Sequence, residues 1–161
     1  MKMKKLFLLA SYTFLIFFIT PAYPRIYKVQ VIEVLDGDTI VIKYNGKKLK
    51  VELSGIDAPE ICPNFGKKSK KVLTRLLVNK IIRLESNGYD INGRVYGKIL
   101  IKGSDINLHF VARGLAWASF NTVDQTYLNA ENNAKINRLN LWEEENPLPV
   151  GQVAHKRCLT S

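Results

Sequence analysis

The chain has 161 residues, of which 47% are hydrophobic. This length and composition fit one compact domain with its own core and argue against a disordered chain. Lysine and arginine outnumber aspartate and glutamate by 24 to 14, a formal charge of +10 at pH 7. Such an excess favours a polyanionic partner, either nucleic acid or an anionic membrane surface, although on charge alone simple solubility explains it equally well.

The first 22 residues predict a secretory signal. MKMKK is a positively charged start, LFLLASYTFLIFFIT (residues 6–20) is an apolar run, and Ala22 precedes a plausible cleavage point. A membrane-spanning helix needs about 20 apolar residues, so an uncleaved anchor over residues 6–20 is the second interpretation. We therefore expect a secreted or periplasmic protein, or one anchored in the membrane by this segment.

The only two cysteines are Cys62 and Cys158, and the only two histidines are His109 and His155. The cysteines lack the CxxC spacing of zinc sites, and the histidines supply no matching pattern. In an oxidising compartment a single intramolecular pairing is available to two cysteines, so export predicts a Cys62–Cys158 disulfide.

Residues 27–53 predict three strands. YKVQVIEV (residues 27–34) alternates apolar and polar side chains, as a half-buried strand does. TIVIKYNGKKLKVEL (residues 39–53) predicts two more strands around Asn45-Gly46, the sequence of a two-residue type I′ turn.

That turn fixes a register for the hairpin. It pairs Ile42 with Leu49 on an apolar face and Thr39 with Glu52 on the polar face. Because the apolar pairs coincide on one side, the predicted register is self-consistent.

The remaining elements alternate between helices and strands. Residues 67–79 predict an amphipathic helix, residues 80–86 and 94–101 predict strands separated by a turn-rich loop, Asp105 is expected to cap a helix that Gly114 ends, and residues 125–142 predict a last helix. This order indicates an α+β protein, a small twisted β-barrel with helices packed on it, over residues 23–145. Residues 146–161 predict an irregular tail.

Four carboxylates gather near one end of the predicted hairpin. Asp36 and Asp38 lie in VLDGDTI at its mouth, and Asp57 and Glu60 lie in GIDAPE just after its second strand. A hairpin brings its open ends together, and like charges placed so closely need compensation. Carboxylate and carbonyl oxygens are ligands for hard divalent cations, whereas each motif alone is typical of a turn. Both motifs together predict a metal site.

The ordered motifs DGDTIVI, GIDAPE, DINGR and INLHFVARGLA resemble the thermonuclease (staphylococcal nuclease-like) family over residues 27–145. The resemblance implies an OB-type five-stranded barrel with three helices. It also implies an enzyme that cleaves phosphodiesters in DNA and RNA with Ca²⁺ and leaves 3′-phosphate ends. Nucleic acid is then the substrate, no protein partner is implied, and a monomer is expected.

Site residues follow from the resemblance position by position. Asp38, Asp57 and the Ala58 carbonyl match the metal ligands, Glu60 matches the glutamate that orients or deprotonates the attacking water, and Arg94 matches an arginine that holds the phosphate. Asp36 matches a position near the ion, and its alternative role is to form the turn.

One position departs from the family pattern. Glu52 stands where the family usually has a second phosphate-binding arginine. A carboxylate there is expected to weaken binding of the transition state, and Lys50, two residues back on the same face, substitutes only in part because lysine lacks the bidentate fork. If Glu52 is merely an exposed strand residue, its partner is expected to be Lys50 or Lys48.

The aromatic positions of the family are also thinned. Asn92 stands where a tyrosine is common, and Phe120 lies near another aromatic position. Phe120 is able to stack on a base, but burial in a small core under the loop is the more common use of such a residue. The sequence thus predicts an exported Ca²⁺-dependent nuclease, and the rival is a nucleic-acid-binding OB module whose catalysis Glu52 has weakened or abolished.

Overall fold

The computed structural model describes residues 25–59, 65–89 and 93–143. Its strands are β1 (Arg25–Val34), β2 (Thr39–Tyr44), β3 (Lys47–Leu53), β4 (Ile56–Asp57), β5 (Ile81–Tyr89), β6 (Val95–Ile101), β7 (Ser104–Asp105) and β8 (Trp117–Ala118). Its helices are α1 (Phe65–Leu77), α2 (Ile106–Ala112), α3 (Gln125–Ile136) and the short 3₁₀ helix η1 (Asn140–Trp142). None of the helices in these ranges is long and apolar enough to span a membrane.

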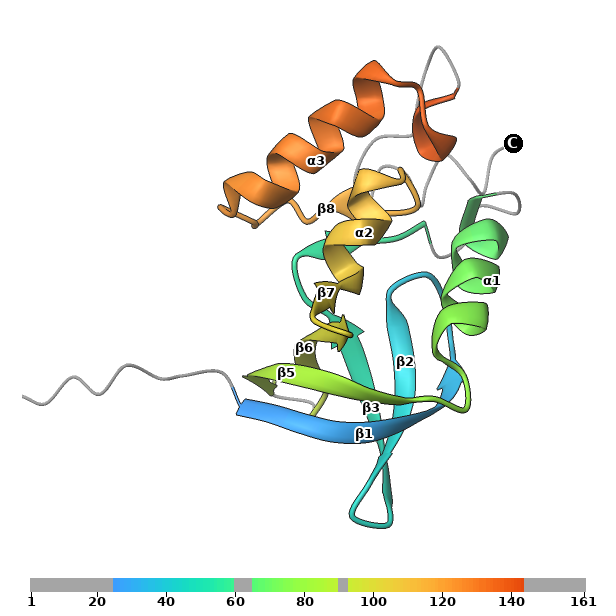
Figure 1. The fold of residues 1–161 in the computed structure, drawn as a ribbon, viewed down its shortest axis with the longest axis vertical. Coiled ribbons are helices and arrows are strands. Elements are labelled where there is room, and N and C mark those ends of the chain that lie inside the picture. Colours follow the sequence, from blue (N-terminus) through green and yellow to red (C-terminus); the bar gives the residue numbers. More distant parts are fainter. Residues whose placement is uncertain (1–24, 60–64, 90–92, 144–161) are drawn as a thin grey trace, which may run out of the picture.

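Five strands form a closed barrel. They follow the order β3-β2-β1-β5-β6, and a parallel pairing of β3 with β6 closes the ring. In Figure 1, β1 and β5 run side by side across the β2–β3 hairpin, whose turn projects below them, α1 lies to one side, and α2 and α3 lie above the barrel. The expected five-stranded OB-type barrel with three helices, an α+β fold, is confirmed.

The hairpin has the register that its turn predicted. Thr39 pairs with Glu52 and Ile42 with Leu49. Asn45 and Gly46 have φ angles of 48° and 78°, the left-handed conformation that a type I′ turn requires at both central positions. The barrel is filled by the inward side chains of its strands, and Leu73 and Leu77 of α1 complete the core.

β5 is longer than the sequence indicated. The turn-rich stretch expected from residue 87 instead continues the strand to Tyr89, where it pairs with Val95. The pairing shifts between Ser86 and Gly88, and Gly88 has a φ of 124°. A glycine bulge therefore absorbs the turn-forming residues without ending the strand.

The C-terminal helix is shorter than predicted. α3 ends at Ile136, and Arg138 and Asn140, the first residue of η1, then adopt positive φ angles of 49°. Backbone in this conformation cannot continue a right-handed helix. The chain folds back here against Gly114, where an added Cβ would lie 2.2 Å from the carbonyl oxygen of Leu139.

α2 begins as predicted. The Asp105 carboxylate accepts a hydrogen bond from the Leu108 amide at 3.0 Å and a second from the Tyr127 hydroxyl at 2.8 Å. The first bond satisfies a free amide at the helix start, and the second ties α2 to α3. Gly114 follows the helix with a φ of 62°, as a helix-ending glycine does.

Candidate active site

The two acidic motifs meet at Asp38. Its Oδ2 accepts a hydrogen bond from the Ala58 amide at 2.6 Å, and its own carbonyl accepts one from the Leu53 amide at 2.8 Å. These contacts join the DGD turn at the mouth of β2 to the corner that follows β3 and β4. The predicted convergence of the motifs is thus present in the fold.

Gly37 makes this close approach feasible. A Cβ at this position would lie 2.6 Å from the Ala58 Cβ and 2.9 Å from the Ser69 Cβ. Such distances are well inside van der Waals contact, so a side chain would push the DGD turn away from the corner and from α1. Ser69 is itself fixed, because its hydroxyl donates to the Leu115 carbonyl at 2.5 Å.

Asp38 is a buried carboxylate whose ionised form is destabilised by its surroundings. Its side chain is 6% exposed, and burial, followed by the charge of Asp36, raises its pKa from 3.8 to about 8. The Ala58 amide and the Thr39 hydroxyl, which donates to Oδ1 at 3.1 Å, oppose the rise without cancelling it. A nearby positive charge would remove this penalty.

Asp36 has the turn-forming role. Its Oδ1 accepts a hydrogen bond from the Asp38 amide at 3.1 Å, the geometry of an aspartate that stabilises its own turn. The same arrangement places its charge beside Asp38.

The other expected metal ligands lie at the same corner. Asp57 is half-buried in β4 and pairs with Trp117 of β8, and Ala58 is buried next to it. Glu60, the expected base, lies outside the described residues, as do Asn92, Cys62 and Cys158. In the described ranges, no group of three or more His, Cys, Asp or Glu side chains is placed to hold a metal ion. The predicted set needs only two such side chains together with a backbone carbonyl.

The donor chemistry fits a hard divalent cation. The candidate ligands, Asp38, Asp57 and the Ala58 carbonyl, offer only oxygen atoms. The raised pKa of Asp38 agrees with this, since burial and the Asp36 charge destabilise the ionised carboxylate and, among the residues that the structure describes, only hydrogen bonds from Ala58 and Thr39 oppose them.

Arg94 forms an ion pair with Glu52. Its Nη1 lies 2.9 Å from Glu52 Oε2, and the two side chains are 39% and 32% exposed. The expectation that Glu52 pairs with Lys50 or Lys48 is wrong. The parallel pairing of β3 with β6, in which Glu52 lies beside Tyr96, brings the start of β6 next to Glu52.

The ion pair lies close to the acidic corner. Thr39 is directly opposite Glu52 across the hairpin, and Thr39 also donates to Asp38. Directly opposed residues in antiparallel strands have Cβ atoms about 5 Å apart. The buried carboxylate and the Arg94 guanidinium are therefore separated by one pair of strand residues.

Phe120 is not a core residue. Phe120 is 90% exposed, so the interpretation of burial under the loop is wrong. The alternative, stacking on a base at the surface, stays a prediction. Lys50 is exposed on the outer face of β3, opposite Val41.

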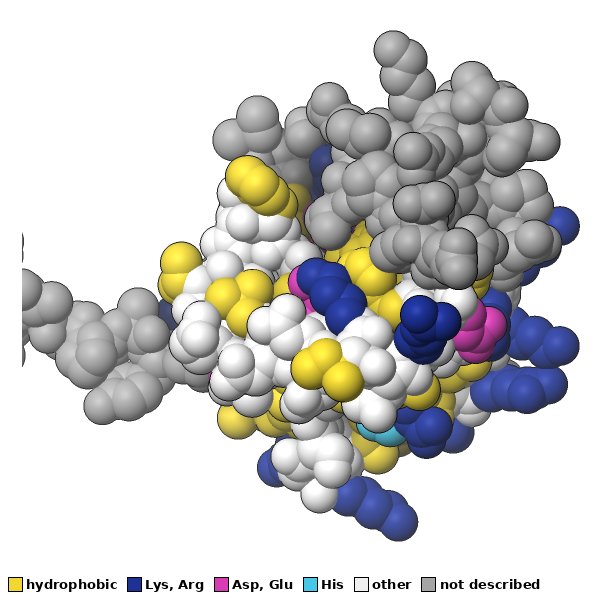
Figure 2. Space-filling model, turned by 90° about the horizontal axis from the view of Figure 1, so that it is seen from above, with side chains coloured by type: hydrophobic (Ala, Val, Ile, Leu, Met, Phe, Trp, Pro, Cys, Tyr) yellow, Lys and Arg dark blue, Asp and Glu magenta, His cyan; other side chains and the backbone are white. Residues whose placement is uncertain are grey.

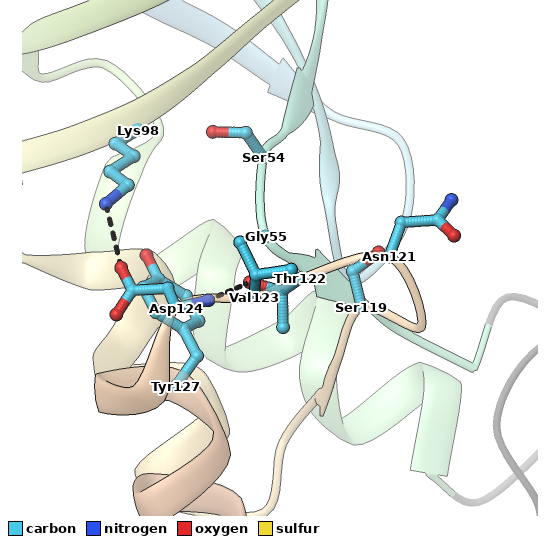
Figure 3. A pocket seen from close by; sticks show the side chains of 9 residues that line it. All are labelled: Ser54, Gly55, Lys98, Ser119, Asn121, Thr122, Val123, Asp124 and Tyr127. Atoms are coloured by element: carbon cyan, nitrogen blue, oxygen red, sulfur yellow. Dashed lines mark hydrogen bonds and ion pairs between the residues drawn. The ribbon is translucent and has the colours of Figure 1, made fainter.

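A hollow of about 350 Å³, whose lining includes Ser119 and Asn121, the two neighbours of Phe120 in the sequence, was not predicted from the sequence. In Figure 3, Ser54 and Lys98 lie on one side of it and Asp124 faces them. Lys98 Nζ is 3.9 Å from Asp124 Oδ2 and 5.1 Å from the centre of the Tyr127 ring. One signal in the sequence could have indicated this site: alternation along β6 and the residue before it puts Arg94 and Lys98 on the same face.

Asn107 joins the elements behind this hollow. Its Nδ2 donates to the Ser54 carbonyl at 2.9 Å and to the Gly97 carbonyl at 3.2 Å, while its Oδ1 accepts from the Ile99 amide at 3.2 Å. The side chain is fully buried. It fixes α2 against β6, which begins directly after Arg94, and against the end of β3, which carries Glu52.

Comparison with known proteins agrees with this geometry. Residues 50–144 match the model of the family described as staphylococcal nuclease homologue. The chain is 38% identical over 125 residues to a Haemophilus influenzae protein named "Uncharacterized endonuclease", covering 76% of this chain and 70% of that protein.

Two further relatives have more specific names. A Shigella flexneri "Micrococcal nuclease" is 31% identical over 129 residues, covering 73% of this chain and 74% of that protein. A Staphylococcus intermedius "Thermonuclease" is 32% identical over 122 residues, covering 68% and 73%. The fold, the meeting of the two acidic motifs and these matches agree, and the chain belongs to the staphylococcal nuclease family.

Proposed function

We propose that this protein is an exported, Ca²⁺-dependent nuclease that hydrolyses phosphodiester bonds in DNA and RNA and leaves 3′-phosphate ends. The observation that carries the proposal is the Asp38 carboxylate, buried at a corner of oxygen donors one strand pair away from the Arg94 guanidinium. Relatives named as endonucleases and nucleases support the reaction class. The apolar residues 6–20 support export, with membrane anchoring as the alternative.

The charges suit the chemistry of phosphodiester hydrolysis. Water adds to phosphorus, the bond to the 5′ oxygen breaks, and negative charge develops on the phosphoryl oxygens. Ca²⁺ held by Asp38, Asp57 and the Ala58 carbonyl would supply positive charge to those oxygens. Arg94 would donate to the same phosphate, and a group that interacts more strongly with the transition state than with the ground state raises the rate.

Two further residues have proposed roles. Glu60 follows the corner by two residues and is proposed to orient the attacking water or take its proton. Phe120, exposed between Ser119 and Asn121, which line the hollow, is proposed to stack on a base next to the cleaved bond.

A second function is favoured by the Glu52–Arg94 ion pair. A guanidinium already bound to a carboxylate must exchange that partner for the substrate phosphate, which lowers the gain from binding. A protein with this pair intact in the complex would bind nucleic acid and cleave it weakly or not at all.

Plasmid digestion separates the two functions. The purified protein is incubated with supercoiled plasmid in Ca²⁺ or in a chelator, beside its Asp38→Ala variant. The nuclease predicts nicking and linearisation that need both Ca²⁺ and Asp38. Cleavage that persists in the chelator would contradict the metal assignment, and binding without cleavage would select the second function.

A further inference from the structure

The outer face of the β2–β3 hairpin carries an unusual arrangement of lysines. Lys43 on β2 lies directly opposite Lys48 on β3, and Lys50 follows on the same face of β3. All three side chains are exposed. Like charges directly opposite each other across a strand pair destabilise a sheet. A polyanionic ligand would offset this repulsion, which nothing in the pairing of the hairpin itself does.

The same charge continues onto the neighbouring strands. Lys43 pairs on its other side with Gln30 of β1, and Lys28, two residues earlier on β1, lies directly opposite Arg83 of β5. Lys28 and Arg83 are both exposed. We call Lys28, Lys43, Lys48, Lys50 and Arg83 together the basic strand face.

Carboxylates do not neutralise the basic strand face. Within the parts of the chain that the structure describes, none of its five cations makes an ion pair. By contrast, Lys98 lies near Asp105 and Asp124. Three acids border the face: Glu33 opposite Val41, Glu85 two residues after Arg83 on the same side of β5, and Glu52, whose carboxylate is bound to Arg94.

The basic strand face leads away from the candidate active site. Glu52, Lys50 and Lys48 alternate along one side of β3, and four residues of strand span about 13 Å. A polymer bound at Arg94 would therefore meet these lysines if it continued along the hairpin. Strands of OB barrels present this kind of face to oligonucleotides.

The chemistry of the face selects a polyanion with phosphates along its length. Lysine acts as a point charge and carries no base readout, so the interaction would be independent of sequence. Anionic lipid headgroups would also attract these cations, and exposed Ile26 and Ile81 flank Lys28 and Arg83 on the same face. Nucleic acid is favoured because the lysines of β3 continue directly from Glu52, the partner of Arg94 at the candidate active site.

We propose that the basic strand face binds the sugar-phosphate backbone of the nucleic acid outside the nucleotides at the cleavage site. The inference rests on the proposed nuclease function and adds to it a length-dependent contact. This contact makes long nucleic acids better ligands than short ones, and it weakens as the salt concentration rises. Figure 2 views the molecule from the α2 and α3 side, where basic side chains project at several points, so charge alone does not single out the hairpin and the test needs a matched control.

Two triple variants remove the same charge from different surfaces. Lys28→Ala/Lys43→Ala/Lys48→Ala changes the basic strand face, and Lys67→Ala/Lys70→Ala/Lys71→Ala changes exposed lysines of α1. Binding of fluorescent single-stranded oligonucleotides of about 6 and about 30 nucleotides is measured by anisotropy over a salt series, in chelator to prevent cleavage. A second strand-face variant replaces Lys28, Lys43 and Lys48 with glutamine. Thermal melts of every variant separate loss of the contact from loss of the fold.

In the strand-face variants, the ratio of the affinity for the long oligonucleotide to that for the short one should fall about ten-fold. Their slope of log affinity against log salt should fall by about 2, because each lost phosphate contact on a single strand contributes about 0.7. The α1 variant should keep the wild-type length preference. Equal losses in both triples would overturn the proposal in favour of net charge.

Binding to anionic lipid vesicles is the second experiment able to contradict the proposal. If the strand-face triple no longer binds phosphatidylglycerol vesicles but binds both oligonucleotides as the wild type does, the face contacts membranes and the proposal is wrong. The plasmid assay distinguishes this failure from failure of the nuclease function. Absent cleavage with length-dependent binding would refute only the nuclease, and cleavage without length preference would refute only the basic strand face.

Discussion

Replacing Glu52 with arginine is expected to raise phosphodiester cleavage about ten-fold or more. In the structure, the Glu52 carboxylate lies 2.9 Å from Arg94 Nη1 and competes directly with a substrate phosphate for that guanidinium. The substitution removes the competitor and adds a second group able to donate to the phosphate. Both effects act where charge develops in the transition state.

The magnitude follows from the exposure of the pair. A hydrogen bond to a charged group contributes roughly 1.5 to 3 kcal/mol, whereas exposed ion pairs contribute about 1 kcal/mol or less. Glu52 and Arg94 are 32% and 39% exposed, so screening brings the value between these two ranges, to about 0.7 to 1.4 kcal/mol. Releasing Arg94 alone, by Glu52→Gln, should then raise kcat/KM about 3- to 10-fold, since roughly 1.4 kcal/mol is a factor of ten. The arginine variant should exceed that.

The assay compares initial cleavage rates of a defined oligonucleotide at saturating Ca²⁺ for the wild type, Glu52→Gln and Glu52→Arg. Glu33→Gln is the matched control, because Glu33 is an exposed carboxylate on β1 whose cross-strand partner is Val41. It should leave kcat/KM within about two-fold. Calcium affinity is measured in parallel by calorimetry. If Glu52→Arg weakens Ca²⁺ binding sharply and brings no gain in rate, Glu52 is a metal ligand and the reasoning fails.

Three further predictions concern the corner and its support. Asp38→Ala or Asp57→Ala should nearly abolish Ca²⁺-dependent cleavage, and a variant with more than a tenth of wild-type activity would remove that residue from the metal site. Because the pKa of Asp38 is raised to about 8, its proton stabilises the metal-free fold below pH about 4, and this contribution is lost as the pH rises toward 8. Urea unfolding in chelator should show the free energy of unfolding falling by at most about 1.4 kcal/mol per pH unit as the pH rises from about 4 toward 8. An equal slope in Asp38→Asn would show that another group causes the pH dependence. Asn107→Ala should lower the free energy of unfolding by about 3 kcal/mol, because it leaves buried backbone groups without partners. Loss of less than 1 kcal/mol in urea melts would show that the site relaxes.

Local chemistry in the sequence determined the hairpin and the start of α2. Asn45-Gly46 favours a two-residue turn, and alternation with a period of two allows only one register that keeps the apolar side chains together, so the Thr39–Glu52 pairing followed without a structure. Asp105 at the start of α2 was equally local, since a capping carboxylate bonds an amide only three residues away. The four ordered motifs placed Asp38, Asp57 and Arg94 at one site by resemblance.

Tertiary structure decided which partners those residues have. Glu52 and Arg94 are 42 residues apart, and they meet only because β3 and β6 pair in parallel to close the barrel. No turn between them specifies that pairing. Closure depends on the twist and stagger of all five strands, so cross-strand neighbours at the seam are not readable from local periodicity. The exposure of Phe120 has the same origin: whether a loop side chain is buried depends on which elements pack around the loop, and here the core is filled by side chains of other elements.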